Sequence, residues 1–302
     1  MDERTALRLL ADDLPAAGDD AAIVDGLVVT TDMLHETTDF PAGTTRYTAG
    51  WRAVGASLSD VAAMGAEATA AVAVYADSDF AESDLRAFVR GAREVCEAVD
   101  AEYVGGDLDD HAEFTTVSTA VGRTDDPVLR SGAEPGDRVV VTGTLGRSAA
   151  ALRYFERGDA ERGNDLFQFT PRVRAGRALA GSATAMMDSS DGLARSLHQL
   201  AAASDCRIAV EWDALPADES VVAVAESETD RRELTAFFGE DFELVATVPE
   251  SALSAVRASS PTDLSVVGRV TASDAAGESN EGEPRVVAED GPVPDRGYTH
   301  GE

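Results

Sequence analysis

The sequence predicts an α/β protein built from two domains. Short apolar runs typical of strands alternate with amphipathic helical segments in both halves of the chain. Between the halves, residues 123–137 are rich in Pro, Gly and charge, which is typical of a boundary between domains. A chain of 302 residues is also long enough for two compact cores. We therefore divide it into residues 1–125 and 126–302.

A predicted hairpin opens the first half. Short apolar runs lie on either side of Gly26, and acidic residues stand at both ends. Asp20 and Asp32 are therefore expected to approach each other. Two carboxylates that close repel unless a cation lies between them, and hard cations with oxygen ligands are the usual solution. The hydroxyls of Thr30 and Thr31 would add further oxygen ligands.

The spacing of apolar residues predicts the other helices and strands. Helices are predicted at 46–64 and 85–99, and strands at 69–75 and 114–121. The second half is predicted to hold strands at 138–141, 184–187, 242–248 and 264–270, with helices following residues 146 and 192 and a further helix between the last two strands. The acidic stretch 273–284 is predicted to be a solvated loop.

The charge is strongly unbalanced. The chain carries 56 acidic and 25 basic residues, all of them Arg, for a formal net charge of -31. This is the composition of a salt-adapted surface. It argues against nucleic acid or an anionic membrane as the partner, because both would be repelled. With 44% hydrophobic residues the chain is still expected to be globular.

Cysteine usage and hydropathy indicate the compartment. Cys96 and Cys206 fall in different predicted domains, which speaks against a disulfide framework or a cysteine-rich zinc site, and both are expected in the core. No window approaches the length of a membrane span, and the N-terminus does not resemble a signal peptide. A cytoplasmic protein is expected.

Acidic residues recur where predicted strands end, beside Gly, Ser or Thr. Singly, each is more often a turn residue or a helix N-cap than a ligand. Their repetition favours a shared role, since a salt-adapted surface would scatter acids over exposed helices and loops. The set is Asp20, Asp32, Asp60, Asp107, Asp188 and Asp191.

Several familiar sites are excluded or disfavoured. The phosphate-binding loop GxxxxGK[ST] and the protein-kinase motif both require Lys, which is absent. Residues 143–146 (GTLG) fit a structural turn better than a phosphate loop. The histidines lack metal-ligand spacing, and no motif for acyl chemistry is present. Any phosphate would therefore be bound by metal ions, backbone N–H groups and Arg side chains. Arg130 is the leading candidate among the Arg residues, and a surface salt bridge is its alternative role.

The ordered set of motifs resembles one family. The stretches are GDDAA at Gly18, TTD at Thr30, SLSDVAAMGA at Ser57, GGD at Gly105, RSGAEPGD at Arg130, DSSDGL at Asp188, GEDFEL at Gly239 and GY at Gly297. Together they resemble thiamine-monophosphate kinases of the AIR-synthetase-like ATP-binding superfamily, in family order across nearly the whole chain. The resemblance implies a PurM-like fold. Its N-terminal mixed sheet would pair with that of a twin in a homodimer, and a C-terminal α/β domain would close over the site.

The resemblance also implies residue roles. Several Mg²⁺ ions would be held by Asp20, Thr30, Thr31, Asp32, Asp60, Asp107, Asp188 and Asp191. ATP would contact Gly106, Asp107, Arg130 and Ser190, and thiamine phosphate would contact Glu240 and Tyr298, the latter by stacking. Where the family usually has a substrate-contacting His before Phe, this chain has Asp39. A carboxylate there would repel a phosphate unless a metal bridged them, and the nearby His35 is a candidate to compensate.

The implied reaction is transfer of phosphate from ATP to thiamine monophosphate. The accepting phosphate, with a second pKa of about 6, is already largely dianionic at neutral pH, so no general base is needed. Repulsion between two polyanions is the obstacle, and bound cations relieve it. The alternatives are another ATP-dependent synthetase of the superfamily and a non-catalytic, cation-binding acidic protein.

Overall fold

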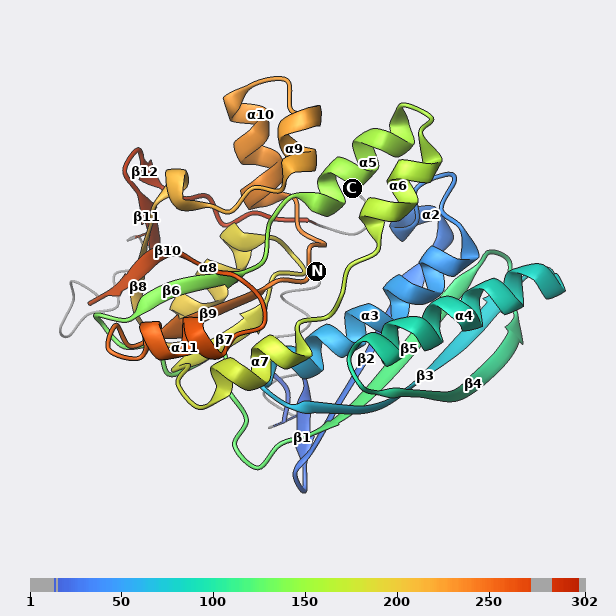
Figure 1. The fold of residues 1–302 in the computed structure, drawn as a ribbon, viewed down its shortest axis with the longest axis horizontal. Helices are drawn as coiled ribbons and strands as arrows, with labels where there is room; N and C mark the ends of the chain where they lie inside the picture. Colours follow the sequence, from blue (N-terminus) through green and yellow to red (C-terminus); the bar gives the residue numbers. More distant parts are fainter. Residues whose placement is uncertain (1–13, 15, 273–283, 299–302) are drawn as a thin grey trace.

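The structure is a computed structural model that describes residues 14, 16–272 and 284–298. In Figure 1 two sheets stand side by side, each built by one half of the chain. The predicted loop 273–284 and His300 lie outside the described residues, apart from Pro284. In the part of the chain that is described, no helix is both long and apolar enough to cross a membrane.

The N-terminal half forms a five-stranded sheet in the order β1-β2-β5-β3-β4, in which only β3 and β4 run parallel. Its elements are β1 (Ala22–Val24), β2 (Leu27–His35), α2 (Glu36–Asp39), α3 (Arg46–Ala63), β3 (Glu67–Asp77), α4 (Glu82–Ala98), β4 (Glu102–Asp110) and β5 (Thr115–Arg123). Strand β4 is therefore an edge strand of this sheet.

The opening hairpin is confirmed. Val24 pairs with Leu27, which leaves Asp25 and Gly26 as the turn. Both have positive φ, 51° and 77°. An Asp-Gly pair suits this turn, because Gly has no side chain to oppose a positive φ and Asp tolerates it better than most residues.

Helices α3 and α4 cover one face of the sheet (Figure 1). Thr45 caps α3 by accepting a hydrogen bond from the N–H of Thr48. The two helices approach closely at Gly50 and Gly91, where an added Cβ would lie 2.2 Å from the carbonyl oxygen of Phe88 and 2.0 Å from that of Tyr47. Among the described residues, no helix covers the opposite face of the sheet.

The C-terminal half forms a seven-stranded sheet in the order β12-β11-β8-β10-β6-β9-β7. Its strands are β6 (Arg138–Thr142), β7 (Ala185–Asp188), β8 (Arg207–Val210), β9 (Leu244–Val248), β10 (Leu264–Thr271), β11 (Val286–Ala288) and β12 (Gly291–Pro292). Its helices are α5 (Arg147–Glu156), α6 (Ala160–Phe167), α7 (Val173–Ala180), α8 (Leu193–Ala203), α9 (Glu219–Val224), α10 (Glu228–Arg232) and α11 (Leu253–Ser259), with a 3₁₀ turn at Trp212–Ala214 and a π-helical turn at Glu233–Phe237.

The two halves share a continuous core around α3. The helix contacts β2, β3 and β5 of its own half as well as α7 and β7 of the other. Buried residues of α3 such as Val54 and Leu58 belong to the same apolar cluster as Met186 and Leu244. Helix α3 can thus carry side chains from the N-terminal half into a site between the two sheets.

Most predicted elements are present with small changes in their bounds. The strand predicted at 242–248 begins only at Leu244, because Glu240 and Phe242 have φ values of 64° and 54° that do not fit a strand. The Gly pair 105–106 lies inside β4, and an added Cβ on Gly106 would lie 1.7 Å from the carbonyl oxygen of Ala73. Both cysteines are buried and free, as expected.

Candidate functional site

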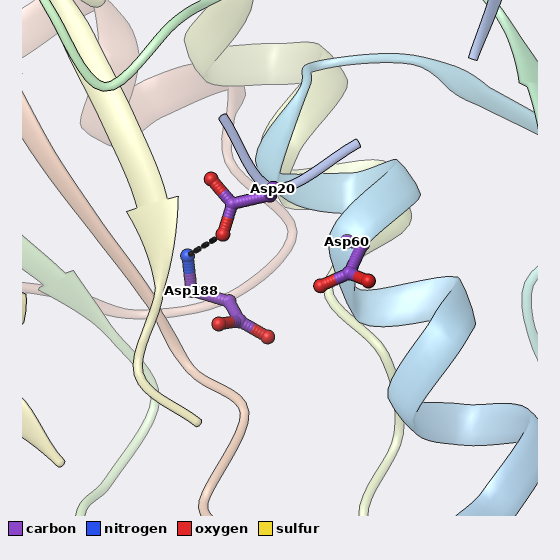
Figure 2. Close-up of side chains that lie close together, drawn as sticks. All are labelled: Asp20, Asp60 and Asp188. Carbon is purple, nitrogen blue, oxygen red and sulfur yellow. Dashed lines mark hydrogen bonds between the residues drawn. The ribbon is translucent and has the colours of Figure 1, made fainter. Parts of the chain in front are cut away.

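Three carboxylates meet between the two sheets. Asp20 precedes β1, Asp60 lies on α3, and Asp188 ends β7, and one oxygen of each lies within 4.8 Å of the others. Figure 2 shows their carboxylates converging, with the backbone N–H of Asp188 donating to Oδ1 of Asp20. The three residues come from three separate parts of the chain, so only the tertiary fold assembles them.

Hydroxyl groups hold the carboxylates in place. Thr30 donates a hydrogen bond to Oδ2 of Asp60, and Ser59 donates to Oδ2 of Asp188. Asp32 lies outside the group of three, and its Oδ2 accepts a hydrogen bond from Ser57. Asp20 thus meets Asp60 and Asp188, and the charge of Asp32 acts on Asp60 from outside this group.

The cluster is electrostatically strained. Burial raises the pKa of Asp60 well above its ordinary value, and the charges of Asp32, Asp188 and Asp20 raise it further. Burial and then the charge of Asp20 raise the pKa of Asp188 to about 7, although hydrogen bonds from Ser59 and Ser190 oppose the shift. Carboxylate and hydroxyl oxygens are the donors that Mg²⁺ and Ca²⁺ prefer, so the donor set fits a hard divalent cation.

A cavity of about 660 Å³ is the second part of the site. It is lined by α2 and the residues after it, by α5, by residues 233–240 and by the C-terminal segment 296–298. Asp39, Glu240 and Tyr298, which the sequence analysis singled out for substrate contact, all line it. Residues from both ends of the sequence therefore meet at one cavity.

The cavity wall combines acids with aromatic rings. The ring of Tyr298 packs 5.3 Å from that of Phe238, and burial together with the charges of Glu240 and Asp39 raises the pKa of the Tyr298 phenol to about 12. Oδ2 of Asp39 accepts hydrogen bonds from the backbone N–H of His35 and the hydroxyl of Thr38. Carboxylates and ring faces together suit an organic cation.

Comparison with known proteins agrees with this geometry. Family models described as AIR synthase related protein match residues 18–124 (N-terminal domain) and 134–278 (C-terminal domain). A thiamine-monophosphate kinase of Halobacterium salinarum is 64% identical over 90% of this chain and 93% of its own length. The chain belongs to the thiamine-monophosphate kinase family. Another member, from Methanospirillum hungatei, is 43% identical over 83% of this chain and 87% of its own length.

Solved structures of the family share the fold. One, described as AaThiL complexed with AMPPCP and TMP, matches with a TM-score of 0.87 and 27% identity, covering 99% of this chain and 97% of the other. The expected α/β fold of the superfamily is thereby confirmed. The relative from Halobacterium salinarum also fits the expectation of a salt-adapted protein.

Two residues that the sequence analysis expected to bind metal, Thr31 and Asp107, lie outside the group of three carboxylates. Thr31 is exposed and donates to the carbonyl oxygen of Ser118, whereas Thr30 and Asp32, its neighbours on β2, point to the α3 side. Asp107 lies on the edge strand β4, in the register row that runs through Val74 and Val117 to Met33. Because side chains alternate along a strand, Thr31 and Asp107 both belong to the uncovered face of the sheet.

The remaining expected residues lie around the cluster. Ser190 donates its N–H to Oδ1 of Asp188, and its carbonyl accepts the N–H of Glu240. The partly exposed carboxylate of Asp191 lies 3.8 Å from Arg195, and its carbonyl accepts the N–H of Tyr298. The loop after β7 thus touches both the acid cluster and the cavity.

A second cavity, of about 480 Å³, lies between α4 and β4. Gly106 and Asp107 line it together with apolar side chains that include Leu85 and Tyr103. The sequence analysis favoured a structural turn at residues 143–146 over a phosphate loop. In the structure the N–H groups of Gly146 and Ser148 donate to the carboxylate of Asp241, which gives the turn a structural role.

Sequence reasoning missed Arg52. Its guanidinium is buried and pairs with Glu240 on the wall of the first cavity. The available signal was one Arg on the part of the helix where small and apolar residues predominate, since a buried charge there must find a partner. The partner itself, 188 residues away, could not be read from the sequence.

Proposed function

We propose that this protein transfers the γ-phosphate of ATP to thiamine monophosphate, giving thiamine diphosphate. The observation that carries the proposal is the placement of an acid cluster for cations beside a cavity of acids and aromatic rings, in a chain of this family. The acid cluster, once it holds cations, suits anionic phosphates. The cavity suits a cationic thiazolium ring.

The chain's own residues supply binding and orientation. Asp20, Asp60 and Asp188 would hold Mg²⁺, joined by Thr30 and Asp32 on the same side of β2 and by Asp191. Bound Mg²⁺ would screen the charge on the reacting phosphates. The accepting phosphate is already ionised at neutral pH, so no residue is assigned as a general base.

The ring end of the substrate would bind in the 660 Å³ cavity. Tyr298 would stack on the ring system, and Glu240 and Asp39 would face its positive charge. This assignment resolves the departure at Asp39. A carboxylate that would repel a phosphate is well placed beside a cationic ring.

The phosphates of ATP would lie near the acid cluster and contact Arg130 and Ser190. Gly106 and Asp107 line a separate cavity on the edge strand, suited to the flat, apolar face of a base. Three strands of the sheet separate β4 from β1, beside the cluster, so one copy of the chain does not place Asp107 there.

A homodimer would explain the uncovered face. Met33, Val72 and Val104 are exposed by 57%, 36% and 58% in this sheet, and an apolar sheet face without a cover is typical of an interface. A second copy packed on it would cover this surface and lie beside Thr31 and Asp107. We therefore include the dimer in the proposal.

One assay tests the activity. Purified protein with Mg-ATP and thiamine monophosphate should form thiamine diphosphate and ADP in equal amounts, measured by chromatography. Absence of the diphosphate with any divalent metal would contradict the proposal. ADP formed together with inorganic phosphate and no diphosphate would favour the synthetase alternative. A melting temperature raised by Mg²⁺ and not further by Mg-ATP would favour the non-catalytic alternative.

A further inference from the structure

The loop that carries Glu240 is held in an unusual conformation. Glu240 has a φ of 64° and Phe242 a φ of 54°, and residues other than Gly seldom adopt such angles. Each such residue raises the energy of the folded backbone and persists only where its surroundings hold it. Glu240 is one of the residues that line the 660 Å³ cavity. Something must therefore hold this loop at the cavity wall.

Arg52 makes the contacts that do so. Its Nη2 donates to the carbonyl oxygen of Glu240 at 2.9 Å and to Oε2 of the same residue at 2.6 Å. One nitrogen thus donates hydrogen bonds to both the backbone and the side chain of Glu240. The carbonyl of Glu240 also accepts a hydrogen bond from the hydroxyl of Ser148.

The rest of the guanidinium binds other walls of the cavity. Its Nη1 donates to the carbonyl oxygen of Phe167, the last residue of α6, and to the hydroxyl of Ser148 in the first turn of α5. Helix α5 supplies Leu152 and Phe155 to the cavity, and Phe167 lines it as well. Arg52 itself belongs to α3 of the N-terminal half. One side chain therefore joins three segments that form the cavity.

The position of the guanidinium is fixed by aromatic rings. Its central carbon lies 3.6 Å from the centroid of the Phe167 ring, 5.5 Å from that of Phe169 and 5.4 Å from that of Phe242. Arg52 is only 1% exposed, and its Nε has no hydrogen-bond partner among the described residues. A buried charge of this kind depends on its one ionic partner, so Arg52 and Glu240 constrain each other.

We propose that Arg52 is a positioning residue for substrate binding: it sets the position of Glu240 and draws α5, α6 and the loop 239–243 into one cavity wall. This inference rests on the proposed function, because it concerns the affinity for thiamine monophosphate. Among the described residues no hydrogen bond or ion pair joins Arg52 to Asp20, Asp60 or Asp188, so we expect the KM for ATP to depend on Arg52 much less than the KM for thiamine monophosphate.

The chain offers a matched control in Arg172. It also forms an ion pair with a buried carboxylate of the same loop region, that of Glu243, yet neither residue lines the 660 Å³ cavity. Breaking either pair should lower the melting temperature, because each leaves a buried carboxylate without its partner. Only the loss of the Arg52 pair should change substrate binding.

The experiment compares Arg52→Gln and Arg52→Lys with Arg172→Gln and Arg172→Lys by steady-state kinetics and melting temperature. For Arg52→Gln we expect KM for thiamine monophosphate to rise by about 10-fold or more, with KM for ATP changed by less than about 2-fold, as for lost ground-state binding. Arg52→Lys should recover part of this loss, because it keeps the charge but not the planar fork. Both Arg172 variants should keep the wild-type KM.

A double substitution makes the test specific to the pair. Arg52→Gln combined with Glu240→Gln should raise KM by much less than the product of the two single effects, since both remove the same contact. Unchanged KM in both Arg52 variants, or equal effects at Arg52 and Arg172, would overturn the inference. If Arg52→Gln does not fold, Arg52→Lys against Arg172→Lys decides. Failure of the wild type to form thiamine diphosphate would contradict the proposed function instead.

Discussion

Arg130 donates two hydrogen bonds to the carboxylate of Asp20, one from Nε to Oδ2 and one from Nη2 to Oδ1, each 3.1 Å long. A cation would need the same two oxygens. Burial by itself would lower the pKa of Arg130, but the charges of Asp20, Asp188 and Asp60 and the hydrogen bonds to Asp20 raise it above its ordinary value, so this side chain offsets part of the charge of the cluster. Arg130 thus occupies a place that bound metal would share or take over.

The first prediction concerns Arg130→Gln. Removing this counter-charge should lower the melting temperature of the metal-free protein and increase the gain in melting temperature on adding Mg²⁺, because Mg²⁺ would then supply the counter-charge that Arg130 supplies in the wild type. Thermal melts over a Mg²⁺ titration measure both. A smaller gain than in wild type would show that Arg130 helps to hold the metal rather than competing with it.

Asp60→Asn should separate stability from activity. Because burial and the charges of Asp32, Asp188 and Asp20 raise the pKa of Asp60, removing its charge should stabilise the metal-free protein at neutral pH. Turnover should fall by about 100-fold or more, since a metal ligand is lost. Urea unfolding and the diphosphate assay measure the two effects. The control is Asp25→Asn, at the exposed turn of the hairpin, which should change neither.

The acid cluster also predicts how stability depends on pH. The pKa of Asp188 is about 7 in the folded protein against an ordinary value of 3.8, so between these values the folded state holds a proton that the unfolded state has released. The metal-free protein should therefore lose stability as the pH rises from about 4 to about 7. Bound Mg²⁺ favours the ionised carboxylates, so its stabilising effect should be larger at about pH 8 than at about pH 5. An effect independent of pH would contradict this.

The uncovered face of the first sheet predicts the oligomeric state. Val72→Glu, at the centre of this face on β3, should convert a dimer into a monomer, because a buried charge without a partner opposes association. Light scattering coupled to size exclusion gives the mass. Val222→Glu, on a residue of α9 that is 65% exposed, is the matched control and should leave the mass unchanged. A monomeric wild type would refute the dimer.

Salt dependence follows from the charge of -31. Repulsion among surface carboxylates should be relieved by screening, so the melting temperature should rise with KCl concentration. The comparison is a series of melts in KCl and in sucrose of equal osmolality. A melting temperature highest in dilute buffer would refute the expectation.

Part of the site was accessible from local sequence. Thr30 and Asp32 alternate along a strand, which places them on one side, and the same rule puts Thr31 on the other. Strand alternation therefore separates Thr31 from the two ligand candidates on either side of it. An apolar run that ends in Asp188, followed by Ser and Gly residues, is a recognisable signal for a strand that ends in a turn.

By itself the sequence determined the α/β class, the hairpin at Gly26, the position of α3 and the acidic residues that surround the site, because these depend on periodicity and on turn chemistry within a few residues. Only the tertiary structure decided which acids meet. Asp20, Asp60 and Asp188 converge because α3 packs between two sheets, and Arg52 finds Glu240 across 188 residues for the same reason. Contacts between distant segments depend on how whole elements pack, and no local pattern along the chain encodes them.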